Sequence, residues 1–386
     1  MKFKLAYFVT HPIQYQAPLL RLLAQSDSID LTVFFLCNPS AHKTQDIGFG
    51  KTVQWDIPLL EGYKHVFIES EFDKGGIGFK NPRVNLEEFK KYLVVTRWDA
   101  VWFHGYINKA LLYGMWICKE NKIPFFFRAE SNLTCTSRGF LKDRLIRWIV
   151  KNSAGLLYIG QLNKEYYLSY GADPKKLFFV PYAVDNRFFQ ERVISKKSND
   201  KIIFLYASKF IERKNPKMLV EAYALAREDF AVNESELWLI GDGPEKESVQ
   251  QAILNSGRRD IKILGFKNQT ELPEFYSQCD VFILPSEKEP FGLVVNEVMN
   301  YSKPVLTTDE VGSAKDLIHD NKNGWVIKAN SRNELARVIK KVISGVYNLE
   351  EMGRESLKII NEWNFDKDLQ GLQKAVESVK KDHGQH

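Results

Sequence analysis

Cysteine is scarce in this sequence, and long apolar runs are missing. The four cysteines among 386 residues, Cys37, Cys118, Cys135 and Cys279, are scattered and form no Cys-x-x-Cys pair. This spacing argues against a disulfide framework or a zinc site, and it indicates reduced thiols in a cytosolic protein. No run approaches the roughly eighteen apolar residues of a membrane span, so any membrane contact must be peripheral. The opening MKFKLAYFV has too short an apolar part for a signal peptide, and it predicts a buried first strand.

A strong charge of one sign is also missing. Residues 1–190 carry 25 Lys and Arg against 17 Asp and Glu, and the remaining residues carry 29 against 31. This excess is too small for a nucleic-acid partner, but it suits a surface that meets anionic lipid or phosphate. The sequence shows no repeat of fixed short period and no low-complexity segment.

What the sequence does have is an alternation of short apolar runs with amphipathic helical stretches. In the first half the strand candidates are residues 5–9, 31–36, 100–103, 124–127, 155–160 and 177–180, and the helix candidates are 19–25, 110–121 and 141–152. The strand candidates of the second half are residues 202–207, 237–241, 261–265, 280–285 and 303–308. This alternation predicts an α/β protein with parallel sheets.

The polar stretch 190-QERVISKKSND-200 separates the two halves. We therefore expect two Rossmann-like parallel-sheet domains, residues 1–190 and 195–365, joined by a linker near 186–200. A helix at about 366–384 is expected to pack back on the first domain.

Polar side chains follow the expected strands, where open parallel sheets bind their ligands. In the first half they are Thr10, His11, Gln14, His104, Tyr106, Arg128, Glu130 and Asn132, and in the second half Ser208, Lys209 and Gly241-Asp242-Gly243. We expect these two rows of strand ends to face each other across a cleft. Thr10, His11, Gln14, Arg128 and Glu130 are the candidates for contact with an acceptor.

The stretch 286-SEKEPFGLVVNEVMNYSKPV-305 holds two glutamates, Glu289 and Glu297, around a Pro-Phe-Gly corner. Ser286-x-x-Glu289 predicts a capping box, and Phe291-Gly292 begins the expected helix. A helix start offers backbone N–H groups to an anion, whereas carboxylates would repel it. The two glutamates are therefore expected to accept hydrogen bonds from hydroxyls on either side of a diphosphate. A nucleoside diphosphate sugar has this layout.

The cation for such a diphosphate is expected from SKFIERKNP, which holds Lys209 and Lys214 around a turn. No Asp-x-Asp metal motif follows a strand, and two lysines can carry the charge of the diphosphate, so we expect metal independence and no cofactor. The plainer interpretation makes these lysines solvated loop residues and Glu289 a helix cap. That interpretation explains Glu297 poorly, because Glu297 lies beyond the first turn of the expected helix.

These segments together resemble the retaining, nucleotide-sugar-dependent glycosyltransferases of the GT-B fold, family 4 type. EPFGLVVNEVM is similar to their E-x7-E signature, SKFIERKNP to their G-R-L-x-x-x-K-G/N segment, and LWLIGDGP to their I-V-G-x-G-P. Further similar segments are IKILGF, VGSAKDLI, NGWVI, FFVPYAVD and, in the first half, DAVWFH. The resemblance is dense in the second half and loose in the first.

The resemblance implies a role for each matching residue. Lys209, where the family usually has arginine, and Lys214 would neutralise the donor diphosphate, and Glu297 would hold the ribose. The other implied contacts are Glu289 and the amides of Phe291, Gly292 and Leu293 for sugar and phosphate, Gly265 and Phe266 for the nucleobase, and His104 near the donor sugar. His104, Lys209, Lys214 and Glu289 are the implied catalytic residues.

The first half departs from the family where THPIQYQAP replaces a Gly-Gly loop, so His11 or Gln14 is a candidate for phosphate contact from that side. The resemblance implies transfer of a hexose or N-acetylhexosamine, with retention of configuration, to a saccharide or lipid-linked acceptor in surface polysaccharide or glycolipid assembly. Family frequency favours a UDP-sugar over a GDP-sugar. Two alternatives stay open. An epimerase would turn over donor without acceptor, and a non-catalytic sugar-nucleotide-binding protein would bind donor without transfer.

The stretch 138-RGFLKDRLIRWIVKN-152 predicts a helix with two unlike faces. Leu141, Leu145, Trp148 and Ile149 form the expected core face, and Arg144, Arg147 and Lys151 form a basic stripe. This stripe is either simply solvated or docks on anionic headgroups. In the second case the protein is cytoplasmic but peripheral on the inner face of the membrane.

Overall fold

The structure, a computed structural model, describes residues 2–38, 45–46, 48–49, 51–52, 54–72, 77–136, 139–195, 201–228, 230 and 234–383. The chain divides into two compact units. Unit 1 contains Met1–Gln45, Ile57–Ala183 and Phe365–His386, and unit 2 contains Asp46–Asp56 and Val184–Asn364. This division differs from the expected one at residues 46–56 and 184–190, both of which were expected in the first domain.

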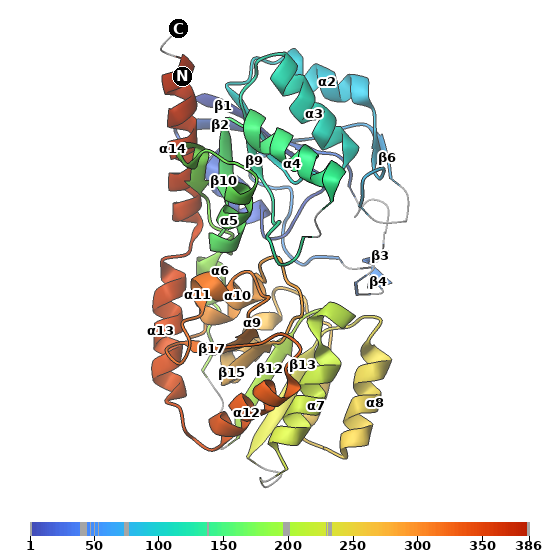
Figure 1. Ribbon diagram of the computed structural model, residues 1–386, viewed down its shortest axis with the longest axis vertical. Helices are drawn as coiled ribbons and strands as arrows, with labels where there is room; N and C mark the ends of the chain where they lie inside the picture. Colours follow the sequence, from blue (N-terminus) through green and yellow to red (C-terminus); the bar gives the residue numbers. More distant parts are fainter. Residues whose placement is uncertain are drawn as a thin grey trace. The chain divides into compact units, whose positions relative to one another are not determined.

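Unit 1 is built on a parallel sheet of seven strands in the order β11-β10-β9-β8-β1-β2-β5 (Figure 1). The strands are β1 (Phe3–Val9), β2 (Ile29–Phe35), β5 (Lys64–Phe67), β8 (Ala100–His104), β9 (Phe125–Arg128), β10 (Gly155–Tyr158) and β11 (Leu177–Phe179). The helices are α1 (Ala17–Ala24), α2 (Leu86–Val94), α3 (Lys109–Glu120), α4 (Phe140–Asn152), α5 (Gln161–Ser169), the 3-10 helix η2 (Pro174–Lys176) and α14 (Phe365–His383). A short antiparallel pair, β6 (Ser70–Glu71) and β7 (Arg83–Val84), lies outside the sheet.

Both faces of this sheet are covered by helices, which is why its strands consist mainly of apolar residues. Successive side chains of a strand point to opposite faces. In β1, Leu5 and Tyr7 pack with the apolar side chains of α1 and α14, while Ala6 and Phe8 pack with those of α2, α3, α4 and α5. The strand runs predicted from the sequence therefore all lie in this sheet, and the edge strand β5 is the one strand of the sheet that was not predicted.

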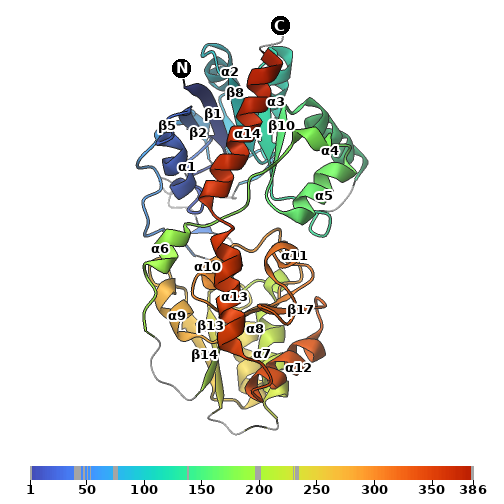
Figure 2. The ribbon, with the colours of Figure 1, turned by 90° about the vertical axis from the view of Figure 1, so that its left-hand side faces the viewer.

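Helix α14, the last helix of the chain, belongs to unit 1 and lies along its sheet beside β10 (Figure 2). Its bounds agree with the helix expected at about 366–384. Leu372, Val376 and Val379 are buried in the same core as β1 and α1. Burying a side chain of this size contributes about 1.5–3 kcal/mol, so α14 is an integral layer of unit 1.

The core face expected for α4 is wrong at one position. Leu141 is 80% exposed, and Ile146, Ile149 and Val150 are the buried residues of this helix. Leu145 and Trp148 pack against the core from its margin. Leu141 stands in the first turn of the helix, and helical periodicity does not show where along its axis a helix leaves the core.

Unit 2 is built on a second parallel sheet of six strands, in the order β14-β13-β12-β15-β16-β17. The strands are β12 (Ile202–Ala207), β13 (Ser235–Ile240), β14 (Ile261–Gly265), β15 (Val281–Leu284), β16 (Val305–Thr308) and β17 (Gly324–Ile327). The helices are α6 (Asn186–Gln190), the 3-10 helix η3 (Glu212–Lys214), α7 (Pro216–Ala226), α8 (Lys246–Ser256), α9 (Leu272–Gln278), α10 (Val294–Met299), α11 (Ala314–Leu317), α12 (Arg332–Ile343) and α13 (Leu349–Asn361). Two short ladder segments precede them in sequence, β3 (Gln45–Asp46) and β4 (Lys51–Thr52). The predicted fold class, an α/β protein with two parallel-sheet domains, is confirmed.

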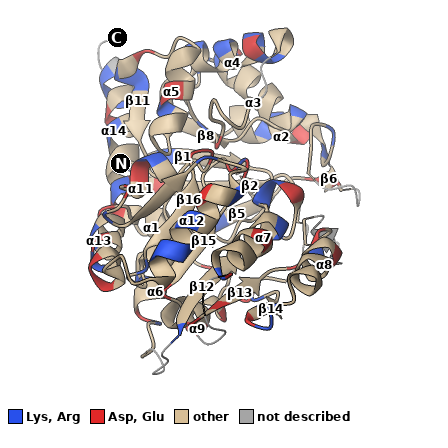
Figure 3. Ribbon diagram, turned by 60° about the horizontal axis from the view of Figure 1, so that its bottom comes forward, with Lys and Arg blue, Asp and Glu red and all other residues tan. Residues whose placement is uncertain are grey.

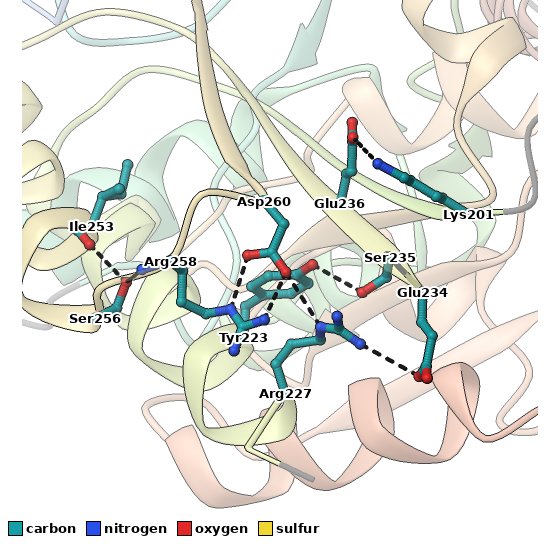
Figure 4. A network of polar contacts seen from close by, with 10 residues as sticks. All are labelled: Lys201, Tyr223, Arg227, Glu234, Ser235, Glu236, Ile253, Ser256, Arg258 and Asp260. Carbon is teal, nitrogen blue, oxygen red and sulfur yellow. Dashed lines mark hydrogen bonds and ion pairs between the residues drawn. The ribbon is translucent and has the colours of Figure 1, made fainter. Parts of the chain in front are cut away.

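A network of ion pairs holds α7 to the amino-terminal end of this second sheet (Figure 4). The fully buried Arg227, at the end of α7, contacts Asp260 through Nε (3.4 Å) and Glu234 through Nη1 (3.6 Å). Arg258 binds the same Asp260 carboxylate from its other side at 2.8 Å. Because Glu234 and Asp260 directly precede β13 and β14, this network stabilises the sheet at the end opposite to the carboxyl ends of its strands.

All four cysteines are free, as their scattered spacing predicts. Within the described part of the chain, no helix has both the length and the apolar character needed to cross a bilayer.

Candidate functional site

The second sheet reverses its strand order beside β12. From β12 the chain adds β13 and β14 on one side, and it then places β15 on the other side. In open parallel sheets ligands bind at this reversal, beyond the carboxyl ends of the strands. Lys209 follows β12 by two residues, and the loop that holds Glu289 follows β15. The sequence positions of Lys209 and Glu289 and the strand order of the sheet therefore indicate a candidate site at the same edge of the unit 2 sheet.

Lys214 and Glu289 form an ion pair between the Nζ and Oε2 atoms, and only 8% and 9% of these residues are exposed. Arg213 approaches the same oxygen at 3.4 Å and donates a hydrogen bond to the Lys288 carbonyl (2.9 Å). Burial lowers the pKa of Lys214, the charge of Glu289 opposes this shift, and the charges of Arg213 and Lys209 add to it. Two cations thus contact one carboxylate, the charge of Lys209 also acts on Lys214, and an anionic ligand would relieve the repulsion among the three cations.

The loop that carries Glu289 is fixed by the segment 310–313. Glu289 N–H donates to the Glu310 carbonyl (3.2 Å), and Gly312 N–H donates to the Glu289 carbonyl (3.0 Å). Ser313 N–H bonds the Phe291 carbonyl (2.8 Å). A Cβ atom at position 312 would collide with the Pro290 carbonyl, so glycine is required there. This packing gives the VGS part of the VGSAKDLI segment a physical role.

The predicted capping box is wrong. Helix α10 begins at Val294, its N-cap is Leu293, and no side chain caps it. Ser286 lies eight residues before the helix, fully buried, and its carbonyl accepts a bond from the Thr308 hydroxyl (2.6 Å). The three backbone amides expected to contact the donor, those of Phe291, Gly292 and Leu293, belong to the corner between the Glu289 loop and α10.

Glu297 lies on α10 and is only 2% exposed. Its Oε2 accepts a hydrogen bond from the Tyr276 hydroxyl (2.6 Å). The pKa of Tyr301 is raised, mainly by the burial of its hydroxyl and next by the charge of the Glu297 carboxylate. The Tyr276 bond holds one oxygen of Glu297 in place, which is the arrangement needed to orient the other toward a hydroxyl. Tyr276 gave no signal in the sequence analysis.

Gly265 ends β14, and its carbonyl accepts a bond from Gly241 N–H (3.0 Å). Phe266 follows it, half-buried, in contact with the ring of Phe49. The same ring lies 4.7 Å from Nζ of Lys209. Phe49 thus joins two residues expected at the donor, and the sequence analysis missed it.

In unit 1, the sheet reverses its order between β1 and β8, and His104 ends β8 at this point. Its Nε2 lies 2.9 Å from the Gln16 amide nitrogen, and Gln16 Oε1 accepts a bond from the Tyr7 hydroxyl (2.7 Å). Burial, helped by the charges of Arg128 and His11, lowers the pKa of His104 to about 3. The imidazole is therefore neutral and accepts the amide N–H, which places its proton on Nδ1.

Arg128 and Glu130 lie beside His104 but have partners of their own. Arg128 is buried, donates to the Pro181 carbonyl (2.8 Å) and lies 3.5 Å from Asp368 of α14. Glu130 accepts a bond from the Tyr182 hydroxyl and lies 4.0 Å from Nε2 of His104. Of these two candidates, only Glu130 has a substantially exposed side chain, so Arg128 is better placed to orient its neighbours than to touch a ligand.

Thr10 and His11 follow β1, on the other side of the reversal, with Thr10 Oγ1 2.9 Å from Nδ1 of His11. Gln14 is nearly buried one turn further on. Within unit 1 the structure thus brings His104 and Glu130 together. Within unit 2 it gathers Lys214 and Glu289, with Lys209 near enough for its charge to act on Lys214.

The sequence model of the family described as glycosyl transferases group 1 matches residues 188–358. The match covers less than half of the chain, and it shows that this segment is similar to the group 1 glycosyltransferases. The glycosyltransferase segment lies within unit 2 and carries the Lys209, Lys214, Glu289 and Glu297 positions. The resemblance seen in the sequence is therefore confirmed.

The proteins that this chain resembles in sequence include glycosyltransferases of archaea and bacteria. An uncharacterized glycosyltransferase of Methanocaldococcus jannaschii is 27% identical over 45% of this chain and 48% of its own length. The lipopolysaccharide core biosynthesis glycosyltransferase LpsE of Rhizobium meliloti is 28% identical over 41% of this chain and 45% of its own. The chain thus spans about half the length of the curated relatives it matches.

Among solved structures, the Anabaena protein HepE in complex with UDP matches with a TM-score of 0.73 at 17% identity, over 98% of this chain and all of the other. HepE has also been solved with UDP-glucose, and that structure matches with a TM-score of 0.69 at 16% identity, over 98% of this chain and 99% of the other. At these identities the likeness shows the fold, which both chains share over nearly their whole length.

Proposed function

We propose that this protein is a retaining glycosyltransferase that moves a hexose or N-acetylhexosamine from a nucleoside diphosphate sugar to a hydroxyl acceptor. The observation that carries this proposal is the buried Lys214–Glu289 pair, with Arg213 and Lys209 beside it, at the strand-order reversal of a group 1 glycosyltransferase segment. Cations fixed at this position would stabilise the charge that develops on a leaving diphosphate.

In this proposal the chain itself supplies the electrostatics of the reaction. Lys209 and Lys214 hold the diphosphate, Glu297 accepts bonds from the ribose, and Glu289 orients the sugar. Retention follows from the family resemblance, with the leaving phosphate helping to take the acceptor proton. The neutral His104 is a hydrogen-bonding contact for the donor sugar rather than a general acid, because its pKa of about 3 keeps it unprotonated at neutral pH.

A UDP-sugar is the proposed donor, and the acceptor is a saccharide or a lipid-linked saccharide of surface polysaccharide or glycolipid assembly. The UDP and UDP-glucose complexes of HepE support the nucleotide, and the similarity to LpsE, a lipopolysaccharide core biosynthesis glycosyltransferase, supports the acceptor class. We propose metal-independent catalysis, because the cationic residues named above can carry the charge of the diphosphate.

The proposed location is cytoplasmic, peripheral on the inner face of the membrane. Its support is the basic stripe of α4, in which Arg144, Arg147 and Lys151 are all exposed; Figure 3 colours the Lys and Arg of this helix blue. Three basic residues near an anionic surface contribute roughly 1 kcal/mol each, so the binding is weak and reversible. Leu141 of the same helix, which was expected in the core, is exposed and adds an apolar contact with the membrane surface.

The decisive experiment incubates the purified chain with a panel of UDP- and GDP-sugars and with saccharide or lipid acceptors from a bacterial extract. We expect transfer of one sugar, activity that survives excess EDTA, and a product whose anomeric configuration, read by NMR, equals that of the donor. Donor turnover without acceptor would indicate an epimerase or hydrolase, and tight donor binding without transfer would indicate a binding protein. A strict requirement for a divalent cation would refute the proposed electrostatic role of the lysines.

A further inference from the structure

Residues 46–56 lie in sequence between β2 and β5 of unit 1, yet their contacts place them in unit 2. The side chain of Asn268 donates to the Gln54 carbonyl (2.7 Å). The backbone N–H of Thr270 donates to Oδ2 of Asp56 (3.1 Å), and the Thr270 hydroxyl bonds the same oxygen. The end of this segment is therefore fastened to the loop that follows β14.

At the other end of the segment, Phe49 contacts two residues assigned to the donor site. Its ring centroid lies 4.7 Å from Nζ of Lys209, within the range of a cation–π interaction. The centroid also lies 4.9 Å from that of Phe266, with the ring planes 82° apart. The ammonium expected to meet the diphosphate and the ring expected to meet the nucleobase thus share one aromatic neighbour.

Gly243 of the Gly241-Asp242-Gly243 motif lets this contact form. A Cβ atom at position 243 would lie 2.7 Å from the Gly48 carbonyl and 2.6 Å from the Phe210 carbonyl, and the residue has a φ of +148°. Any side chain there would displace either the Lys209 loop or the turn that presents Phe49. The absence of a side chain at Gly243 therefore leaves room for the Gly48 carbonyl and, with it, for Phe49 beside Lys209.

The Phe49 contact and a bound donor compete for the same groups. The edge-to-face contact of Phe49 with Phe266 leaves no space between the two rings for a stacked base, which needs about 3.5 Å on each side. A phosphate oxygen is a better partner for the ammonium than a ring, because a charge-assisted hydrogen bond is stronger than an exposed cation–π contact. A donor can displace Phe49, but its affinity is lowered by the contacts that are lost.

We infer that Phe49 is a cover of the donor site, which occupies Lys209 and Phe266 when no nucleotide is bound and gives way to a nucleoside diphosphate. This inference rests on the proposed function for the identity of the ligand. It adds a residue from the first fifth of the chain, outside the matched segment 188–358, to the residues that set donor affinity.

The test is a calorimetric titration of UDP into wild type, Phe49→Ala and a matched control, Phe79→Ala, which removes an exposed phenylalanine of unit 1. We expect Phe49→Ala to bind UDP about fivefold to seventyfold more tightly, the range of one lost cation–π and one lost aromatic contact together. The control is expected to bind UDP as wild type does. Unchanged affinity in Phe49→Ala would overturn the inference. Weaker binding would also overturn it and would make Phe49 a wall of the nucleobase site.

A second measurement does not depend on nucleotide binding. An amine-reactive reagent at limiting concentration is applied to all three proteins, and the labelling of Lys209 is quantified by mass spectrometry against that of Lys217. We expect labelling of Lys209 to rise at least twofold in Phe49→Ala, because the ring no longer covers the ammonium. If no protein binds any nucleoside diphosphate, the proposed function fails. In that case the labelling of Lys209 still tests whether Phe49 covers its ammonium. Higher labelling in Phe49→Ala than in wild type supports the inference, and equal labelling overturns it.

Discussion

Replacing Lys214 by methionine removes a buried ammonium and keeps most of the side-chain volume. The Glu289 carboxylate, 9% exposed, then loses its ion-pair partner and retains Arg213 at 3.4 Å. Breaking a buried ion pair from one side costs about 3–5 kcal/mol, and Arg213 offsets part of this cost. We expect the free energy of unfolding to fall by about 2–4 kcal/mol, measured by urea denaturation.

The same substitution removes a charge that is proposed to bind the donor diphosphate. We expect the dissociation constant of UDP to rise at least tenfold, about 1.4 kcal/mol of binding free energy, in a calorimetric titration. The loss is expected to persist under conditions where the variant is fully folded, because it comes from the missing ammonium and not from unfolding.

A double-mutant cycle with Glu289→Gln separates these two effects. In the double variant no uncompensated carboxylate is left, so we expect most of the lost stability to return, while UDP binding stays weak. Lys209→Met is the matched control: Lys209 is half-buried over a ring, and its loss should weaken UDP binding with a change in stability of less than about 1 kcal/mol. Recovery of UDP affinity in the double variant, or wild-type affinity in Lys214→Met, would refute the role given to this charge.

Three further predictions follow from the same structure. Glu297→Gln should weaken UDP binding at least tenfold but leave inorganic pyrophosphate binding unchanged, since this carboxylate is proposed to hold the ribose; equal losses for both ligands, measured by calorimetry, would contradict that assignment. His104 has a pKa of about 3 in the folded protein against 6.5 ordinarily, so the unfolded chain binds its proton first, and stability present above pH 6.5 should be lost as the pH falls below it, by about 1.4 kcal/mol per pH unit. Urea denaturation of His104→Gln should show a correspondingly flatter pH dependence, and an unchanged slope would rule out this residue as its source. The wild type should sediment with anionic liposomes at low salt and be released at high salt, and a variant with Arg144, Arg147 and Lys151 changed to Glu should stay in the supernatant; a wild type that ignores such liposomes points to a soluble acceptor.

The sequence was sufficient for the parts of the structure that depend on local patterns. The central strands of both sheets were predicted from runs rich in apolar residues, because most strand positions of a parallel sheet covered on both faces are buried. The strand ends then placed Lys209 and Glu289 at one edge, as the observed topology does. The edge strands β5 and β17 were missed: β5 has only two apolar residues, and β17 has only four residues, too few to show a periodicity.

The parts that failed depend on contacts between distant residues. The exposure of Leu141 reflects where α4 leaves the core, which helical periodicity does not encode. The pairing of Tyr276 with Glu297 joins residues 21 apart, and the contact of Phe49 with Phe266 joins residues more than two hundred apart. Nothing in the composition of residues 46–56 indicates that they pack with the second sheet, because a change of unit within one loop leaves no mark on a local pattern.

The position of α14 bears on the order in which the two units can fold during synthesis. Domains generally fold as they emerge from the ribosome, the amino-terminal one first. Here all of unit 2 has been translated by Asn364, whereas unit 1 still lacks Leu372, Val376 and Val379 of its core. Unit 2, which holds the glycosyltransferase segment, can therefore complete its fold first. Until α14 is synthesised, the apolar strip of the unit 1 sheet that α14 covers is exposed. That strip is a natural binding place for a chaperone on the nascent chain.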